Sequence, residues 1–98
     1  MAKGYWIARV DVHNEQGYKP YMAANPAIFQ KFGGKFIVRG GKFVGPEGES
    51  RSRNVVIEFP DYQTALDCYH SPEYQANIKV RQPHSIAELV IIEGYDTP

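Results

Sequence analysis

The sequence predicts a single α+β domain whose elements follow the order strand, helix, strand, strand, helix, strand. Two observations support this order: apolar side chains alternate at every second residue near both ends of the chain, and they recur every three or four residues in stretches between them. The length of 98 residues suits one domain, over residues 1–98. With right-handed crossovers, this order gives the ferredoxin-like βαββαβ arrangement, a four-stranded antiparallel sheet with helices on one face.

The composition limits the kinds of partner that the protein can have. Lys and Arg together number 11, as do Asp and Glu, so the formal net charge is zero and the positive charge that nucleic acids require is missing. No apolar run approaches the ~20 residues of a membrane span, and the chain does not start with the apolar segment of a signal peptide. The single cysteine, Cys68, fits a reducing compartment. We therefore expect a cytoplasmic protein that binds neither nucleic acid nor membrane.

The first strand is predicted over residues 4–12, and Asn14 is a suitable N-cap for the helix that follows. This helix extends to Phe32 and carries one stripe at helical spacing: Tyr18, Tyr21, Met22, Asn25, Ile28, Phe29 and Phe32. Pro26 disturbs it, so that the helix either kinks there or restarts with Asn25 as a new N-cap. We favour the capping role for Asn25 over a buried role in a pocket.

The second and third strands are predicted over residues 35–39 and 54–59, after Gly33-Gly34 ends the helix. Gly40-Gly41 interrupts the second strand, as at a bulge or a close backbone approach, and residues 42–44 are expected to continue it. Residues 45–49 have the composition of a turn.

Two short helices and a strand complete the predicted domain. Asp61 is expected to cap a helix whose stripe is Tyr62, Ala65, Leu66 and Tyr69. Ser71-Pro72 begins another short helix that ends at about Val80. The last strand, residues 86–94, is apolar on both faces.

The first and last strands predict a homodimer, because both carry apolar residues on their two faces while the helices cover only one face of the sheet. A solvated face of an antiparallel sheet is normally polar at alternate positions. A second copy packed sheet to sheet about a two-fold axis would cover the remaining face. The alternative is a monomer with an exposed apolar face, which soluble proteins rarely have.

Several segments carry a resemblance to a known family: Lys3–Ile7, Phe32–Gly41, Val56–Pro60 and Ser71–Gln75, together with Arg81. Over nearly its whole length the chain resembles the bacterial domain-of-unknown-function family numbered thirteen-thirty. The resemblance implies a dimeric α/β barrel, the fold of certain small monooxygenases, isomerases and stress-induced proteins. It implies no particular activity, because fold alone does not fix function.

Arg39 is the first candidate for chemistry. It stands in a strand directly before Gly40 and Gly41, whose backbone N–H groups could help it to hold a carboxylate or enolate oxygen. The alternative is an ion pair between Arg39 and Glu58 on a nearby strand.

Other side chains could complete a pocket between helices and sheet, namely Tyr21, Asn25, Tyr74 and Arg81. For the tyrosines the commoner alternative is a place in the core or an interface, with the hydroxyl hydrogen-bonded. Arg53 could close an anionic site together with Arg81, although such arginines are more often solvated or ion-paired. His13, at the end of the first strand, is a candidate general base, with a plain surface histidine as the alternative. Cys68 is expected to be inert.

No cofactor is expected, since no histidine and carboxylate show metal-ligand spacing and neither glycine pair has the GxGxxG pattern. The sequence thus favours a cofactor-independent enzyme of oxygenase, isomerase or lyase type, with Arg39 and His13 as catalytic candidates. Its ligand would be a small organic molecule with an anionic or carbonyl oxygen. The alternatives are a protein that binds such a ligand without turnover and a purely structural homodimer.

Overall fold

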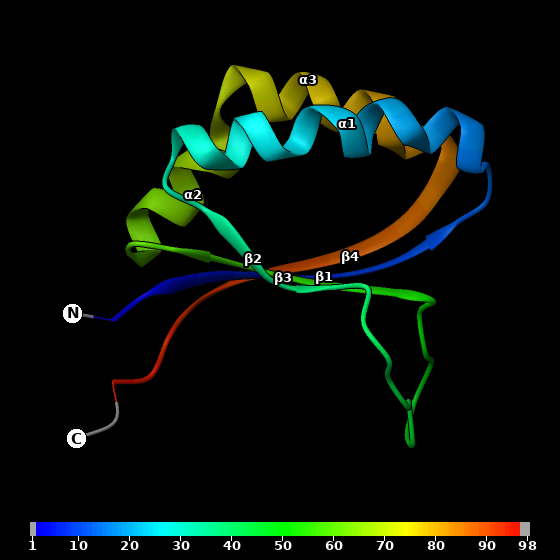
Figure 1. Ribbon diagram of the computed structural model, residues 1–98, viewed down its shortest axis with the longest axis horizontal. Coiled ribbons are helices and arrows are strands. Elements are labelled where there is room, and N and C mark those ends of the chain that lie inside the picture. The colour runs from blue at the N-terminus through cyan, green and yellow to red at the C-terminus, as the bar shows by residue number, and fades with distance from the viewer. Residues whose placement is uncertain (1, 97–98) are drawn as a thin grey trace.

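The computed structural model describes residues 2–96, which form β1 (Gly4–Val12), α1 (Glu15–Lys31), β2 (Lys35–Arg39), β3 (Arg53–Phe59), α2 (Tyr62–His70), α3 (Pro72–Arg81), the 3₁₀ turn η1 (Gln82–His84) and β4 (Ser85–Glu93). The strands form one antiparallel sheet in the order β2-β3-β1-β4. All three α-helices lie over the same face of that sheet (Figure 1). This confirms the predicted α+β class and the ferredoxin-like βαββαβ layout.

The alternation in β1 decides what each face of the sheet carries. Trp6 and Val10 are buried beneath the helices, whereas Ile7 points to the other face and is 39% exposed. Because β1 is a central strand, Trp6 lies opposite Ile57 of β3 and Ile91 of β4. The hydrophobic core therefore lies between the helices and the inner face of the sheet.

Trp6 is the centre of that core. Its ring meets Phe29 of α1 edge-on at a centroid distance of 5.1 Å and Tyr74 of α3 at 4.8 Å. Its indole N–H donates a hydrogen bond of 2.9 Å to the carbonyl of Ala65 in α2. One side chain of β1 thus contacts all three helices and fixes their distance from the sheet.

Helix α1 is continuous through Pro20 and Pro26. Asn14 caps it as predicted, since its Oδ1 accepts a hydrogen bond from the Gly17 N–H at 3.1 Å. The predicted restart at Pro26 is wrong, and Asn25 is a buried side chain with 8% exposure instead of a cap. Packing of the helix face on the core outweighs the backbone hydrogen bonds that the prolines cannot make.

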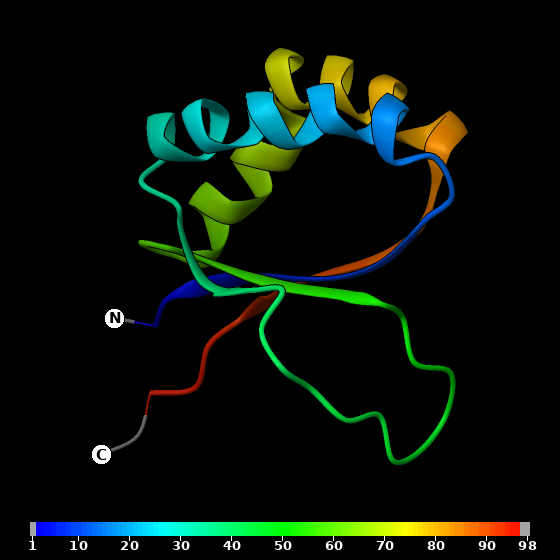
Figure 2. The ribbon, with the colours of Figure 1, turned by 45° about the vertical axis from the view of Figure 1, so that its right-hand side comes forward.

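Strand β2 ends at Arg39, so its predicted continuation over residues 42–44 is wrong. Gly40 has a φ of 68°, in the left-handed region, and it turns the chain out of the sheet. Residues 40–52, here named the arm, leave the sheet on the face opposite the helices and return to β3 (Figures 1 and 2). The arm is exposed from Gly40 to Ser50, and its Val44 is 86% exposed.

A β-bulge lies within β2, earlier than the position predicted from Gly40-Gly41. Phe36 is opposite Ile57 and Arg39 is opposite Val55, with one extra residue in the ladder between Phe36 and Val38. In a regular strand, residues three apart face opposite sides of the sheet. The bulge therefore brings Arg39 to the same, helix-facing side as Phe36.

The remaining predicted elements are confirmed with shifts of one residue at some ends: β3 begins at Arg53, and β4 covers Ser85–Glu93. Asp61 caps α2 by accepting from the Thr64 N–H at 2.7 Å, and Ser71 caps α3. None of the helices in residues 2–96 is long and apolar enough to cross a membrane.

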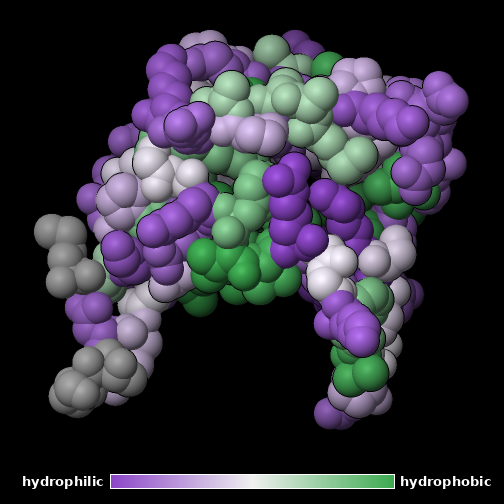
Figure 3. All heavy atoms as spheres, viewed as in Figure 1, coloured by the Kyte–Doolittle hydropathy of each residue, from purple (hydrophilic) through white to green (hydrophobic). Residues whose placement is uncertain are grey.

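The outer face of the sheet, opposite the helices, exposes several large apolar side chains: Ile7, Val38, Ile86, Val90 and Ile92. In the space-filling view the arm stands on one side of this face and the chain that follows β4 on the other (Figure 3). The apolar surface thus lies in a hollow between two projecting segments.

Candidate functional site

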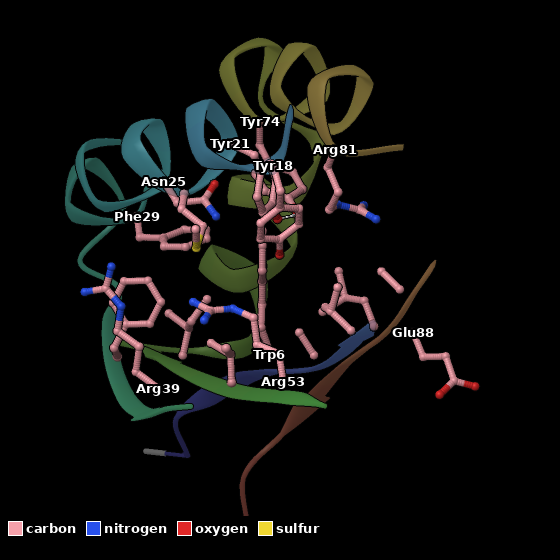
Figure 4. Close-up of a pocket in the computed structure, with 18 residues that line it drawn as sticks. Trp6, Tyr18, Tyr21, Asn25, Phe29, Arg39, Arg53, Tyr74, Arg81 and Glu88 are labelled. Atoms are coloured by element: carbon pink, nitrogen blue, oxygen red, sulfur yellow. Dashed lines mark hydrogen bonds between the residues drawn. The ribbon is translucent and has the colours of Figure 1, made fainter. Parts of the chain in front are cut away.

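A cavity lies between the helices and the inner face of the sheet (Figure 4). The space within it that the centre of a water molecule can occupy is about 40 Å³. Its apolar walls are Trp6, Ala8, Val10, Met22, Phe29, Phe36, Val55, Ile57, Ala87 and Leu89. Its polar lining consists of Tyr18, Tyr21, Asn25, Arg39, Arg53, Tyr74, Arg81 and Glu88. An apolar cavity with a few converging polar groups is the usual form of a small-molecule site.

The structure brings together six of the residues that the sequence singled out: Tyr21, Asn25, Arg39, Arg53, Tyr74 and Arg81. Three others lie elsewhere. His13 is exposed beyond the end of β1, where its backbone N–H donates to the His84 carbonyl at 2.7 Å. Gly40 and Gly41 belong to the arm and do not line the cavity. His13 therefore has no contact with the group that it was expected to assist.

Tyr21 of α1 and Tyr74 of α3 form a hydroxyl pair with an oxygen–oxygen distance of 2.6 Å. Burial raises the pKa of the Tyr74 hydroxyl, and the neighbouring Tyr21 raises it further, so Tyr74 is neutral at physiological pH. Each hydroxyl has one hydrogen, and the pair uses only one of the two. The second hydrogen is available to a molecule in the cavity.

Asn25 is held by a residue that the sequence analysis missed. The Asn77 Nδ2 of α3 donates to the Asn25 Oδ1 at 2.8 Å and to the Tyr21 carbonyl at 3.2 Å. These bonds join α1 to α3 and fix which way the Asn25 amide points. Within residues 2–96 no group accepts a hydrogen bond from the Asn25 Nδ2, which leaves that donor for a ligand. The position of Asn77, three residues after Tyr74 on one helix, was the available signal.

Arg39 makes no ion pair with Glu58, so that alternative is wrong. Glu58 lies 3.9 Å from the Lys35 Nζ and accepts a hydrogen bond of 3.2 Å from the Tyr5 hydroxyl. The Arg39 guanidinium lies over the Phe36 ring, with 4.2 Å between its central carbon and the ring centroid. The bulge and this stacking together place Arg39 at the β2 side of the cavity.

Arg53 and Arg81 also line the cavity, from β3 and from the last turn of α3. Figure 4 shows Arg53 extending from the sheet towards the space below Tyr21 and Asn25. The central guanidinium carbon of Arg81 lies 5.5 Å from the centroid of the Tyr21 ring. The Arg81 Nε is buried and has no hydrogen-bond partner within residues 2–96. Arg53 follows the same alternation as Val55, and this was the sequence signal for its face.

Cys68 is buried in α2, and burial raises the pKa of its thiol to about 12, so the thiolate that nucleophilic chemistry requires is scarce. Within the part of the chain that the structure describes, no three His, Cys, Asp or Glu side chains are grouped to hold a metal ion.

The fold and the cavity define a class, the ferredoxin-like α+β proteins with a helix–sheet pocket. The family model of the Domain of unknown function (DUF1330) matches residues 3–95, and the chain belongs to this family. The resemblance predicted from the sequence is thereby confirmed. A comparison with curated proteins gave no match.

Solved structures share the fold at low sequence identity. A protein of unknown function from Rhodopseudomonas palustris has a TM-score of 0.74 and 17% identity, covering 98% of this chain and 85% of that one. SnoaB from Streptomyces nogalater, a cofactor-independent oxygenase, has a TM-score of 0.69 and 14% identity, covering 99% and 97%. A dimeric ferredoxin-like protein of unknown function from Thermobifida fusca has a TM-score of 0.59 and 12% identity, covering 93% and 92%. These similarities establish the fold.

Proposed function

We propose that the protein is a homodimeric enzyme that converts a small organic molecule in the helix–sheet cavity without a cofactor. The observation that carries this proposal is that Arg39, Asn25 and the Tyr21–Tyr74 hydroxyl pair all line one apolar cavity, with Arg39 at its exposed end. A guanidinium, an amide N–H and a hydroxyl are the donors that stabilise negative charge as it develops on a carbonyl oxygen. Such charge develops in oxygenation, isomerisation and lyase reactions of carbonyl compounds alike.

In this mechanism Arg39 holds the oxygen that becomes anionic, while the free hydroxyl hydrogen of the tyrosine pair and the Asn25 amide orient the substrate. Tyr21, Asn25 and Tyr74 are buried, and the exclusion of water there strengthens the hydrogen bonds that they make to a substrate. His13 is exposed and outside the cavity, so it takes no part in this scheme. The likeness to SnoaB, itself a cofactor-independent oxygenase, supports the reaction class by analogy of fold.

The outer face of the sheet supports the homodimer. Ile7 and Val90 lie side by side on neighbouring strands at its centre, with exposures of 39% and 54%. Contiguous apolar surface of this kind marks an interface in soluble proteins, and a second copy would cover it about a two-fold axis. Two structural neighbours are described as dimeric. A cytoplasmic location, predicted from the sequence, belongs to the same proposal.

Binding without turnover is the second candidate, and one observation favours it. Glu88 is the one carboxylate among the residues that line the cavity, and it lies 3.3 Å from the Arg51 Nε, engaged in an ion pair. Figure 4 shows its side chain directed away from the cavity. With no histidine in the lining either, an enzyme of this kind depends on substrates acidic enough to ionise without a protein base.

The test is a turnover assay in air-saturated buffer without added cofactor. The substrates are a panel of 1,3-dicarbonyl compounds and hydroxyaromatic ketones, followed by oxygen uptake and by mass spectrometry of the products. We expect turnover that Arg39→Ala lowers by about 100-fold or more, the usual effect of removing an oxyanion-stabilising donor. His13→Ala is the matched control and should retain full activity. Bound compounds that are recovered unchanged from the wild-type protein would establish the non-catalytic alternative.

A further inference from the structure

We infer that the molecule bound in the cavity is a flat, apolar organic anion, a conjugated carboxylate or enolate, and that Arg53 and Arg81 select its charge. This inference rests on the proposed function, since it names the class of ligand for the same cavity. It assigns a role to two arginines that the reaction scheme does not use.

The distribution of the arginines carries the inference. The chain has five arginines and a formal net charge of zero. Arg9 and Arg51 lie within 4.0 Å of carboxylates, among them Glu88. The other three, Arg39, Arg53 and Arg81, have no carboxylate within that distance in residues 2–96, and all three line the cavity. In a neutral chain, the unneutralised guanidinium groups are thus gathered at one cavity.

One nitrogen atom of the Arg81 side chain supports an anionic ligand. Its Nε is buried and has no hydrogen-bond partner in the described chain. A buried donor without a partner destabilises a fold, and native structures rarely leave one without reason. A carboxylate or enolate oxygen in the cavity would accept this hydrogen bond and neutralise the charge at the same time.

The cavity cannot neutralise its own arginines. Its ionisable acids, apart from Glu88, are tyrosines, and burial raises the pKa of both Tyr18 and Tyr74. Both therefore stay protonated at neutral pH and act as hydrogen-bond donors, which suits an anion and does not replace it. Guanidinium groups remain charged at every physiological pH.

The aromatic side chains that line the cavity indicate the shape of the uncharged part of the ligand. The rings of Trp6, Phe29 and Phe36 line the cavity, and Arg39 already lies over one of them. Aromatic walls favour flat, conjugated molecules through stacked and edge-on contacts. A strongly hydrated dianion such as phosphate would lose its water against these apolar walls, so a delocalised monoanion is the better match.

The test compares three naphthalene derivatives of equal shape by isothermal titration calorimetry: 2-naphthoate, 2-naphthamide and 2-naphthylmethylammonium. We expect the wild-type protein to bind the anion at least about tenfold more tightly than the amide, as one or two charge-assisted hydrogen bonds require. Arg53→Gln and Arg81→Gln should each shrink this preference to about threefold or less while the affinity for the amide stays within about twofold.

Lys19→Gln is the control, since it removes an exposed positive charge of α1 that lies outside the cavity lining, the arm and the outer sheet face, and it should keep the full preference. Arg53→Lys retains the positive charge and should keep most of the preference for the anion. This result would show that the loss of preference in Arg53→Gln is not caused by misfolding. Equal or tighter binding of the amide or the ammonium compound, undiminished selectivity in both glutamine variants, or no detectable binding of 2-naphthoate would each overturn the inference. Anion selectivity without turnover in the assay above would reject the enzyme and leave the inference standing.

Discussion

Asn25 and Asn77 fix the relative position of α1 and α3, the two helices that cover the cavity on the side away from the sheet. Both are buried, and their hydrogen bond of 2.8 Å links the middle of α1 to the middle of α3. A buried amide pair of this kind contributes little net stability while intact but is costly to break, because the remaining partner stays desolvated.

Replacing Asn77 by Ala should therefore lower the free energy of unfolding by about 2 kcal/mol, since the Asn25 oxygen and the Tyr21 carbonyl both lose a donor. Urea denaturation followed by the fluorescence of Trp6, the single tryptophan, measures this loss. Gln63→Ala, which removes an exposed amide on α2, should change stability by less than about 0.5 kcal/mol. If both substitutions lower the free energy of unfolding equally, the buried Asn25–Asn77 hydrogen bond does not contribute more to stability than an exposed amide.

Cys68 should resist thiol reagents in the folded protein. Its thiol is buried, and burial raises its pKa to about 12, so almost none of it is the reactive thiolate at pH 8. We expect Ellman's reagent to label less than about a tenth of the native protein in the time that labels the urea-unfolded protein completely. Rapid stoichiometric labelling of the native protein would show that the helix α2 opens readily.

The sequence could predict which side chains line the cavity better than it could predict the residues to which they are hydrogen-bonded. Tyr21 and Tyr74 could be chosen because they stand on apolar helix faces, and both line the cavity. The position of Asn25 in the apolar stripe indicated its burial, but its hydrogen bond to Asn77, on another helix and 52 residues further along the chain, could not be predicted. Arg39 was placed correctly in a strand, but its face depends on a bulge that no local pattern specifies.

Helix α1 forms although its sequence contains two prolines, which normally break a helix. Its interior contains Pro20 and Pro26, each of which removes a backbone hydrogen bond and crowds the preceding turn. The face formed by Tyr21, Asn25 and Phe29 is buried all along the helix and holds it together. Packing thus decides the structure where local propensity points to a break.

Pro26→Ala should raise the free energy of unfolding by about 1 kcal/mol, because it restores a helical N–H that Pro26 cannot supply, less the unfolded-state entropy that proline removes. Pro26 is exposed, so no core contact is lost. The shift in the thermal midpoint, measured by circular dichroism, tests this. A lower midpoint would show that the helix needs the local bend of proline to keep Asn25 beside Asn77.

Most elements were predictable because their apolar periodicity and their caps agree, as for β1, α2 and α3. The failures fall around β2. Residues 42–44 contain two apolar side chains that read as strand, yet the φ of 68° at Gly40 takes them away from any partner strand. A strand exists only where a neighbour completes its hydrogen bonds, and a single sequence does not reveal that neighbour.

The helices cover one face of the sheet and leave the other uncovered, and the proposed homodimer is argued from this imbalance. The three helices cover the inner face, while the apolar centre of the outer face lies between the arm and the chain after β4 (Figure 3). The hollow is open to a second copy, whose own projecting segments would then pass along the sides of the first. The helix–sheet cavity stays on the far side of the sheet from this interface.

Ile7→Asp should weaken the dimer by about 100-fold or more, because it would bury an unpaired carboxylate at the centre of the interface. Analytical ultracentrifugation across a range of protein concentrations measures this. The control is Val80→Asp on α3, whose exposure of 38% nearly equals the 39% of Ile7. If Val80→Asp dissociates the dimer and Ile7→Asp does not, the helices form the interface instead of the sheet.

The arm begins directly after Arg39 and ends directly before Arg53. Two of the three arginines that line the cavity therefore flank the arm. A second copy that touches the arm would also restrain both guanidinium groups, and an anion held by those groups would restrain the arm. The two binding events would then be thermodynamically linked, and each would change the affinity of the other by the same factor. We expect the affinity for 2-naphthoate to fall when the protein is diluted below its dimer dissociation constant, so that self-association acts as the effector of the cavity.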